Sequence, residues 1–144
     1  LYDTWENFDR GFTTINIPII RYADVLLIFA EAENMSKGGP TQAAVDAVNQ
    51  IIDRANGYQP NPDYPLLSTG MTKEAFDAAV INERSFELCF EYDRWMDIVR
   101  KRILFEVTRE DYRINFNEED YLYPIPESEI RLNENMVQNP GYGG

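Results

Sequence analysis

The 144-residue sequence contains no histidine and a single cysteine, Cys89. Without histidine, these residues cannot form a Ser-His-Asp or Cys-His catalytic set, an HExxH zinc site or histidine-ligated iron. One cysteine excludes an internal disulfide bond and any metal site built from several cysteines. Because Cys89 lies within the apolar run Phe86–Phe90, the sequence predicts that it packs as a small buried hydrophobic residue.

Basic residues are also scarce, with 13 Lys and Arg against 25 Asp and Glu, which gives a net charge of -12. This balance argues against a nucleic-acid partner and against direct docking on anionic lipid head groups. The acidic surplus does not by itself indicate a catalytic site, because most surface carboxylates only keep the surface hydrated. A chain of this length is long enough to bury a hydrophobic core.

No run of residues has the pattern of a signal peptide, a lipid-attachment site or a transmembrane helix. The chain opens with Leu1 and scattered aromatics such as Tyr2 and Trp5, without a clear period. We therefore expect the C-terminal part of a longer protein whose export signal lies upstream. Residues 1–20 are predicted to be an irregular entry segment.

Helical periodicity dominates residues 21–104. The first predicted helix, 21–37, carries an apolar stripe broad enough to pack on two sides, and Gly38-Gly39-Pro40 ends it. The stripe contains Tyr22, Leu26 and Phe29. A second helix is predicted over 41–56, so that the two form an antiparallel hairpin. Its expected buried stripe is Ala44, Val48, Ile51, Ile52 and Ala55.

A third helix is predicted to begin after the N-cap Thr72 and to break near Tyr92-Asp93, with Asp93 capping a further helix. The apolar positions expected along it are Phe76, Ala79, Val80, Phe86, Cys89 and Phe90. Before it, three prolines within 58–70 exclude helix and predict a loop.

Residues 105–144 are predicted to form a polar loop and then an extended strap, because Pro124, Pro126 and Pro140 disfavour helix. The expected apolar anchors of this strap are Ile125, Ile130, Leu132, Met136 and Val137.

The densest charge cluster has two interpretations. Glu83, Glu87 and Glu91 are spaced four apart, so basic partners are needed, and these are sought among Arg21, Arg84, Arg94 and Arg100. We favour an ion-pair network that joins helices over a paired-carboxylate glycosidase site. On the first helix, Arg21 is expected to pair with Glu31 or Glu33, again as a structural pair.

Aromatic rings suit sugars, because a pyranose face stacks on a flat ring while Asn, Asp and Arg bond the hydroxyls. The candidates outside predicted helices are Trp5, Tyr58, Asn61, Asp63 and Tyr64. Packing or contact with a partner is the competing interpretation. The acidic run Glu118-Glu119-Asp120 lacks the ligand spacing of an EF-hand, so we expect a solvated loop without calcium.

Four blocks carry a resemblance to a known family. They are Arg21-Tyr-Ala-Asp-Val-Leu-Leu-Ile-Phe-Ala-Glu-Ala-Glu-Asn34, Asp53-Arg-Ala-Asn-Gly57, the pair Ile81–Glu91 and Arg94–Arg100, and the closing Leu122-Tyr-Pro-Ile-Pro with Gln138-Asn-Pro-Gly-Tyr142. In this order they resemble the SusD/RagB family of outer-membrane nutrient-binding lipoproteins of Bacteroidetes-type bacteria. Ser85 stands where that family usually has a second arginine, Tyr92 where it has glycine, and Glu134 where it has proline.

The resemblance implies an all-α fold of tetratricopeptide-like helix pairs with long irregular loops and an extended C-terminal strap. Residues 1–144 would then be the C-terminal part of a single SusD-like domain, packed against the remainder of the same polypeptide. It also implies non-catalytic capture of oligosaccharide or polysaccharide, with no cofactor and no metal. The implied partner is a SusC-type TonB-dependent transporter, and the implied anchor is a lipid on an N-terminal cysteine outside this chain, at the outer-membrane cell surface.

Three alternatives stay open: a peptide-binding member of the same family, a fragment of an all-α glycoside hydrolase that uses Glu83 or Glu87, and a helical-repeat adaptor. The resemblance identifies no ligand-binding residue, ligand or linkage. We also expect the isolated 144-residue chain to fold poorly, because its broad apolar faces need further partners.

Overall fold

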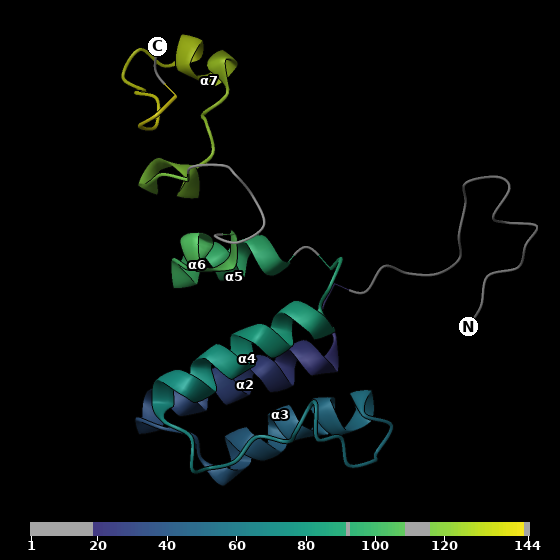
Figure 1. Ribbon diagram of the computed structural model, residues 1–144. Coiled ribbons are helices and arrows are strands. Elements are labelled where there is room, and N and C mark those ends of the chain that lie inside the picture. The colour runs from purple at the N-terminus through teal and green to yellow at the C-terminus, as the bar shows by residue number, and fades with distance from the viewer. Residues whose placement is uncertain (1–18, 92, 109–115, 143–144) are drawn as a thin grey trace, which may run out of the picture. The chain divides into compact units, whose positions relative to one another are not determined.

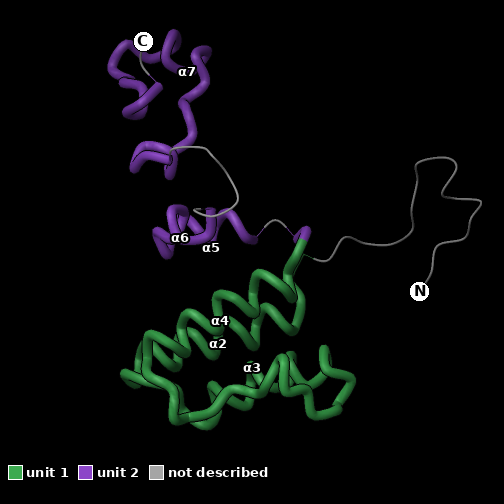
Figure 2. The backbone as a smooth tube through the Cα atoms, viewed as in Figure 1, with its two compact units in different colours: residues 1–89 green, residues 90–144 purple. Residues whose placement is uncertain are grey.

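The computed structural model describes residues 19–91, 93–108 and 116–142, and within these ranges all regular structure is helical (Figure 1). The chain forms two compact units, Leu1–Cys89 and Phe90–Gly144 (Figure 2). Unit 1 contains α2 (Tyr22–Lys37), α3 (Gln42–Ala55) and α4 (Lys73–Glu87). Unit 2 contains α5 (Asp93–Lys101), α6 (Leu104–Thr108), the 3₁₀ helix η1 (Glu118–Tyr121) and α7 (Glu127–Leu132). Among the described residues, no helix is long and apolar enough to cross a membrane.

The ends of the three unit 1 helices follow from local capping. Gly38 adopts the left-handed conformation at φ 77° and stops α2, as the Gly-Gly-Pro turn predicts. Thr41 and Thr72 cap α3 and α4, because their side chains accept hydrogen bonds from the Ala44 and Ala75 N–H groups. The predicted helix limits are therefore confirmed to within one residue at these positions.

In unit 1, α2 packs against both α3 and α4 (Figure 1). Side-chain contacts at the helix ends give the directions. Asn34 near the end of α2 donates to the Lys73 carbonyl at the start of α4, and Arg21 before α2 bonds Glu87 at the end of α4. The helix α4 therefore runs antiparallel to α2, as α3 does across the short turn.

The unit 1 core consists of small and branched side chains around one aromatic ring. Its buried members are Ala23, Leu27, Ala30, Ala44, Val45, Ala47, Val48, Ile51, Ile52, Phe76 and Val80. The expected stripe of α3 is confirmed except for Ala55, which is exposed. Four alanines keep the helices close, because a methyl group lets two backbones approach.

The face of α2 that packs in this core differs from the predicted one. Ala23, Leu27 and Ala30 are buried, whereas Tyr22 is 71% exposed and Phe29 is 44% exposed. Within the described chain, α2 therefore uses one side of its broad apolar stripe and leaves the other side accessible.

The break after α4 comes earlier than predicted. α4 ends at Glu87, and the left-handed residue is Phe90 at φ 66°, two positions before the predicted Tyr92. Phe86 lies in the last turn of α4, and Cys89 and Phe90 follow its end; all three are exposed, Phe90 to 96%, so they do not continue the buried stripe. The expectation of a buried cysteine is thus wrong for this chain. Asp93 is the first residue of α5.

Unit 2 has a small core of its own around Tyr121. The Tyr121 hydroxyl accepts a hydrogen bond from the Leu104 N–H at 2.9 Å, and the centroid of the Tyr121 ring lies 4.4 Å from the Arg102 guanidinium carbon. Ile98 and Leu104 complete the buried set. In this way a tyrosine following the acidic residues of η1 fixes the start of α6.

The proline-containing end of unit 2 is fastened by side chains. Gln138 donates to the Ile125 carbonyl and accepts from the Ile125 N–H, both at 2.8 Å. Asn139 donates to the Tyr123 carbonyl at 2.7 Å, and the Tyr142 hydroxyl donates to the Leu122 carbonyl at 2.9 Å. We call this set the Gln138 clasp. It joins the two halves of the closing sequence block, since prolines 124 and 126 supply no backbone donor.

The predicted strap is non-helical at Leu122–Pro126 and at residues 136–139, but the interval between its prolines forms α7. The exclusion of helix was wrong there, because prolines restrict only themselves and the residue before them, and residues 127–132 contain none. Two predicted anchors are also wrong in this chain. Leu132 is 82% exposed and Val137 is 83% exposed, whereas Ile125, Ile130 and Met136 are half-buried.

Candidate functional site

The loop between α3 and α4 is held against α3 by two asparagines. The Asn49 side chain donates to the Leu67 carbonyl at 2.9 Å and accepts from the Leu67 N–H at 2.8 Å. Asn56 donates to the Tyr64 carbonyl at 2.9 Å. The three prolines of this loop have no backbone N–H, which leaves fewer backbone hydrogen bonds to hold it. The side-chain amides of Asn49 and Asn56 anchor the loop instead.

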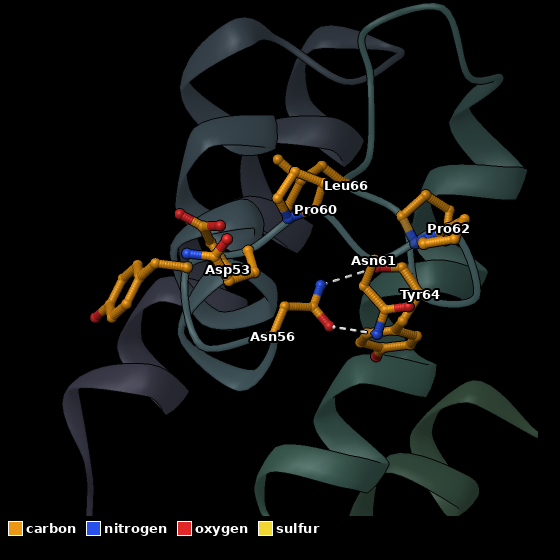
Figure 3. A pocket seen from close by; sticks show the side chains of 10 residues that line it. Asp53, Asn56, Pro60, Asn61, Pro62, Tyr64 and Leu66 are labelled. Atoms are coloured by element: carbon orange, nitrogen blue, oxygen red, sulfur yellow. Dashed lines mark hydrogen bonds between the residues drawn. The ribbon is translucent and has the colours of Figure 1, made fainter.

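A hollow of about 500 Å³ opens between the end of α3 and this loop (Figure 3). Its polar lining consists of Asp53, Asn56, Gln59, Asn61 and the two tyrosines 58 and 64, and prolines 60, 62 and 65 with Leu66 supply apolar surface. Figure 3 shows Asn56 bonded both to Asn61 and to the Tyr64 backbone. These two amides therefore shape the wall as well as line it.

Tyr58 lies at the edge of this hollow in an unusual backbone conformation. It has φ 58°, directly after Gly57 at φ 65°, and its side chain is exposed, with 67% of the residue's surface accessible. A left-handed tyrosine is rare, since its Cβ crowds the following carbonyl. The two left-handed residues turn the chain out of α3 and hold the ring in solvent.

Tyr64 points the other way, toward α4. Its ring meets Phe86 edge-on at 6.1 Å between centroids, and its hydroxyl donates to Glu83. Burial, followed by the hydrogen bond and charge of Glu83, raises the pKa of Tyr64 above its ordinary range. Tyr64 is therefore a neutral donor whose hydroxyl is already used.

Glu83 and Glu87 lie one turn apart on α4 in different environments. Glu83 is only 4% exposed, and burial raises its pKa despite the hydrogen bond from Tyr64. Burial also opposes ionisation of Glu87, but hydrogen bonds from Arg54 and Arg21 outweigh it and lower the pKa of Glu87. Glu87 is thus a structural anion at neutral pH.

The bonds to Glu87 connect all three helices of unit 1. Arg21 Nη1 reaches Glu87 Oε1 at 2.8 Å, and its Nη2 donates to the Glu87 carbonyl at 2.7 Å. Arg54, at the end of α3, donates to Glu87 Oε2. Nearby, buried Arg84 pairs with Asp24 of α2 at 2.6 Å. These pairs link segments 33 to 66 residues apart in the sequence.

The remaining predicted residues lie elsewhere. Trp5 falls outside the described residues. Asp63 is exposed and is not part of the hollow's lining; its N–H donates to Asn61. Glu33 accepts from Thr41, and Glu31 is half-buried on α2. In unit 2, Glu91 and Arg94 are half-buried, and Arg100 pairs with Asp97 at 2.7 Å.

The predicted carboxylates are poorly arranged for glycoside hydrolysis. That reaction requires an acid and a second carboxylate on either side of a sugar bond, both open to the substrate. Here Glu83 is buried under Tyr64, and two arginines hold Glu87. Within the described ranges, no group of three or more metal-binding side chains could hold an ion. Glu118 forms a salt bridge with Arg102.

Three contributors were not found from sequence: Asp24, Arg54 and Asn56. Asp24 and Arg54 have partners that are distant along the chain, so spacing rules that consider neighbours on one helix do not identify them. Asn56, directly before a glycine and a proline-rich loop, did carry a local signal, because asparagine favours such turns.

Comparison with known proteins extends these observations. The model of the SusD family matches residues 2–116 and 104–142. SusD-like protein P2 of Formosa agariphila is 38% identical over 142 residues, and SusD-like protein P25 of the same organism is 33% identical over 147. These alignments cover 94% and 95% of the chain but 28% and 27% of the relatives. The chain therefore spans less than a third of the proteins it matches.

Solved structures give the same result. A SusD homolog from Bacteroides thetaiotaomicron superposes with a TM-score of 0.74 at 31% identity, over 85% of the chain and 26% of that protein. A SusD superfamily protein from Parabacteroides distasonis also gives 0.74, at 34% identity, over 92% of the chain and 28% of that protein.

Proposed function

The chain belongs to the SusD family, and from this membership we propose that its protein binds a nutrient oligosaccharide or polysaccharide without cleaving it. The observation that carries this proposal is the family match, which spans the chain from residue 2 to residue 142. Because the chain covers about 28% of its relatives, the proposal concerns the whole protein, of which these helices form a part.

Location and partner follow from the same membership. We place the protein at the outer-membrane surface, attached by a lipid on an N-terminal cysteine that is not among these 144 residues. The bound nutrient would pass to a TonB-dependent transporter of the SusC type, over which the protein acts as a lid.

Two observations support binding without catalysis. Glu83 and Glu87, the carboxylates expected of a hydrolase alternative, are used internally by Tyr64, Arg21 and Arg54. The hollow beside α3, in contrast, exposes one aromatic ring, Tyr58, next to amides and a carboxylate. A sugar ring can stack on such a surface while its hydroxyls bond the polar groups. Since the Tyr64 hydroxyl is occupied, Tyr64 would contact ligand only through its ring.

The test uses the polypeptide as the cell produces it. Native gels that contain starch, xylan, polygalacturonate or carrageenan should retard the protein, and incubation with these polymers should release no new reducing ends. Reducing ends that disappear in Glu83→Gln would contradict the proposal and favour the hydrolase. Binding of oligopeptides with no retardation by any polysaccharide would favour a peptide-binding member of the family.

A further inference from the structure

A second hollow of about 220 Å³ is lined in part by Tyr58. It is formed by residues before and early in α2 and by the last turns of α3. Its polar and aromatic lining consists of Arg21, Tyr22, Gln50, Arg54 and Tyr58. Tyr58 also lines the larger hollow, so this one ring borders both.

The two hollows differ in charge. The charged side chains that line the smaller hollow are Arg21 and Arg54, whereas Asp53 is the charged residue of the larger one. The two guanidinium groups share the single carboxylate of Glu87, so these three side chains together are net positive in a chain with a net charge of -12. They give one end of this surface a local attraction for anions.

Arg54 has the exposure that ligand binding requires. Its Nη2 donates to Glu87, yet 51% of its side chain remains accessible. A guanidinium carries five N–H donors arranged in a fork that matches a carboxylate or sulfate group. Glu87 also holds the guanidinium in place, which reduces the entropy lost when a ligand binds.

Tyr58 supplies the second element of a sugar site. Its left-handed backbone ends α3, with the Tyr58 N–H bonded to the Asp53 carbonyl at 2.8 Å, and leaves the ring exposed, with 67% of the residue accessible. Strained residues of this kind occur at binding sites, where the side chain must be held in a particular place. Tyr22, 71% exposed, adds a second ring to the same hollow.

We propose that the two hollows form one groove for an acidic glycan, with a sugar ring on Tyr58 and its carboxylate or sulfate group on Arg54. The hydroxyls of the next sugar unit meet Asp53 and Gln59 in the larger hollow. This inference rests on the proposed function, because it specifies the chemical class of a glycan that the protein must first bind.

The experiment compares matched polymers that differ only in charge. Isothermal titration of the complete protein is run with polygalacturonate and its methyl ester, and with carrageenan and its desulfated form. We expect one or both of the charged polymers to bind, the matched neutral form to bind about tenfold more weakly, and affinity to fall with added salt. The two pairs distinguish a carboxylate-bearing from a sulfate-bearing ligand.

Variants then test the site. Arg54→Gln and Tyr58→Ala should each weaken binding about tenfold, while Tyr58→Phe, which keeps the ring, should bind as the wild type does. Arg131→Gln removes the same charge from an exposed pair in unit 2 and should have no effect. Circular dichroism checks folding. If Arg54→Gln is unfolded, the comparison of Tyr58→Ala with Tyr58→Phe tests the site, because the Tyr58 side chain is exposed and its replacement should not affect folding.

Each contrary result has a separate meaning. Binding of neutral polymers unchanged by these substitutions would overturn the acidic groove and leave the proposed function standing. Binding of charged polymers that is independent of Arg54 and Tyr58 would overturn the site. Absence of binding to every polysaccharide, charged or neutral, would overturn the proposed function and this inference together.

Discussion

Tyr64 donates its hydroxyl hydrogen to Glu83, and this bond fastens the loop after α3 to the buried face of α4. The donor belongs to a proline-rich segment with few backbone donors, and the acceptor is a carboxylate that is only 4% exposed. The bond gives the buried carboxylate of Glu83 a hydrogen-bond donor, without which its burial would be strongly unfavourable, and it gives the loop an attachment to α4.

Removing the hydroxyl should destabilise the protein. Tyr64→Phe leaves Glu83 buried without its donor, so the free energy of unfolding should fall by about 1–3 kcal/mol. Tyr58→Phe is the matched control and should change it by less than about 0.5 kcal/mol, because that tyrosine is exposed. Urea unfolding of the complete protein at pH 7 measures both. Equal stability of the two variants would show that the Tyr64 bond contributes nothing.

Glu87 should make stability depend on pH. Arg54 and Arg21 lower its pKa in the folded protein below the ordinary value of 4.5, so the folded state binds fewer protons. Its contribution is complete above pH 4.5 and is lost as the pH falls through the folded-state pKa. The stability advantage of wild type over Glu87→Gln should therefore shrink as the pH falls below 4.5, as urea midpoints would show. An advantage that stays constant over this range would contradict the assignment.

Asn49 should control the order of the loop. Asn49→Ala removes both bonds to the Leu67 backbone, so amide hydrogen exchange across residues 58–70 should accelerate and stability should drop by about 1–3 kcal/mol. Gln42→Ala, on the exposed face of the same helix, is the control. Unchanged exchange in the Asn49 variant would mean that other contacts suffice to hold the loop.

Two adjacent glycines should respond differently to the same substitution. Gly38 has φ 77°, whereas Gly39 does not lie in the left-handed region, and a Cβ at either position meets open space. Gly38→Ala should therefore lower stability by about 1 kcal/mol through backbone strain alone, and Gly39→Ala should be close to neutral. Thermal unfolding of the two variants provides the comparison; the reverse order would refute the capping role of Gly38.

The isolated 144-residue chain should unfold without strong cooperativity. Large apolar side chains stay accessible on and next to the helices, among them Ile28, Phe86 and Phe90. A chain that leaves such groups in water loses much of the free energy that ordinarily stabilises a fold. A steep urea transition, with a slope normal for this length, would be the contrary result.

Helix positions in unit 1 were predictable because their determinants are local. Thr41 and Thr72 cap the helices that follow them, and Gly38 ends the one before it. The break after α4 was predicted near Tyr92, the position at which the SusD/RagB family has glycine. The left-handed residue is instead Phe90, and the sequence gives no sign of this because phenylalanine rarely adopts a left-handed backbone.

The candidate site was predictable in part. Tyr58, Asn61 and Tyr64 lie around one hollow, as their place in a proline-rich loop suggested. The partners of the charged residues were not predictable in the same way. Arg21 bonds Glu87, 66 positions away, rather than only neighbours on its own helix, and such a contact depends on how α2 and α4 pack. Periodicity identifies a helix face but not the residue opposite it.

The Gln138 clasp has a consequence for how the end of the chain folds. A single amide bonds both the N–H and the carbonyl of one residue, Ile125. A shift of the segment by one position would break both bonds at once and bring Pro124 or Pro126, which have no N–H, opposite the glutamine. The clasp therefore favours a single register of the closing segment. Strand pairing specifies register less strictly, because its backbone hydrogen-bonding groups repeat along the chain.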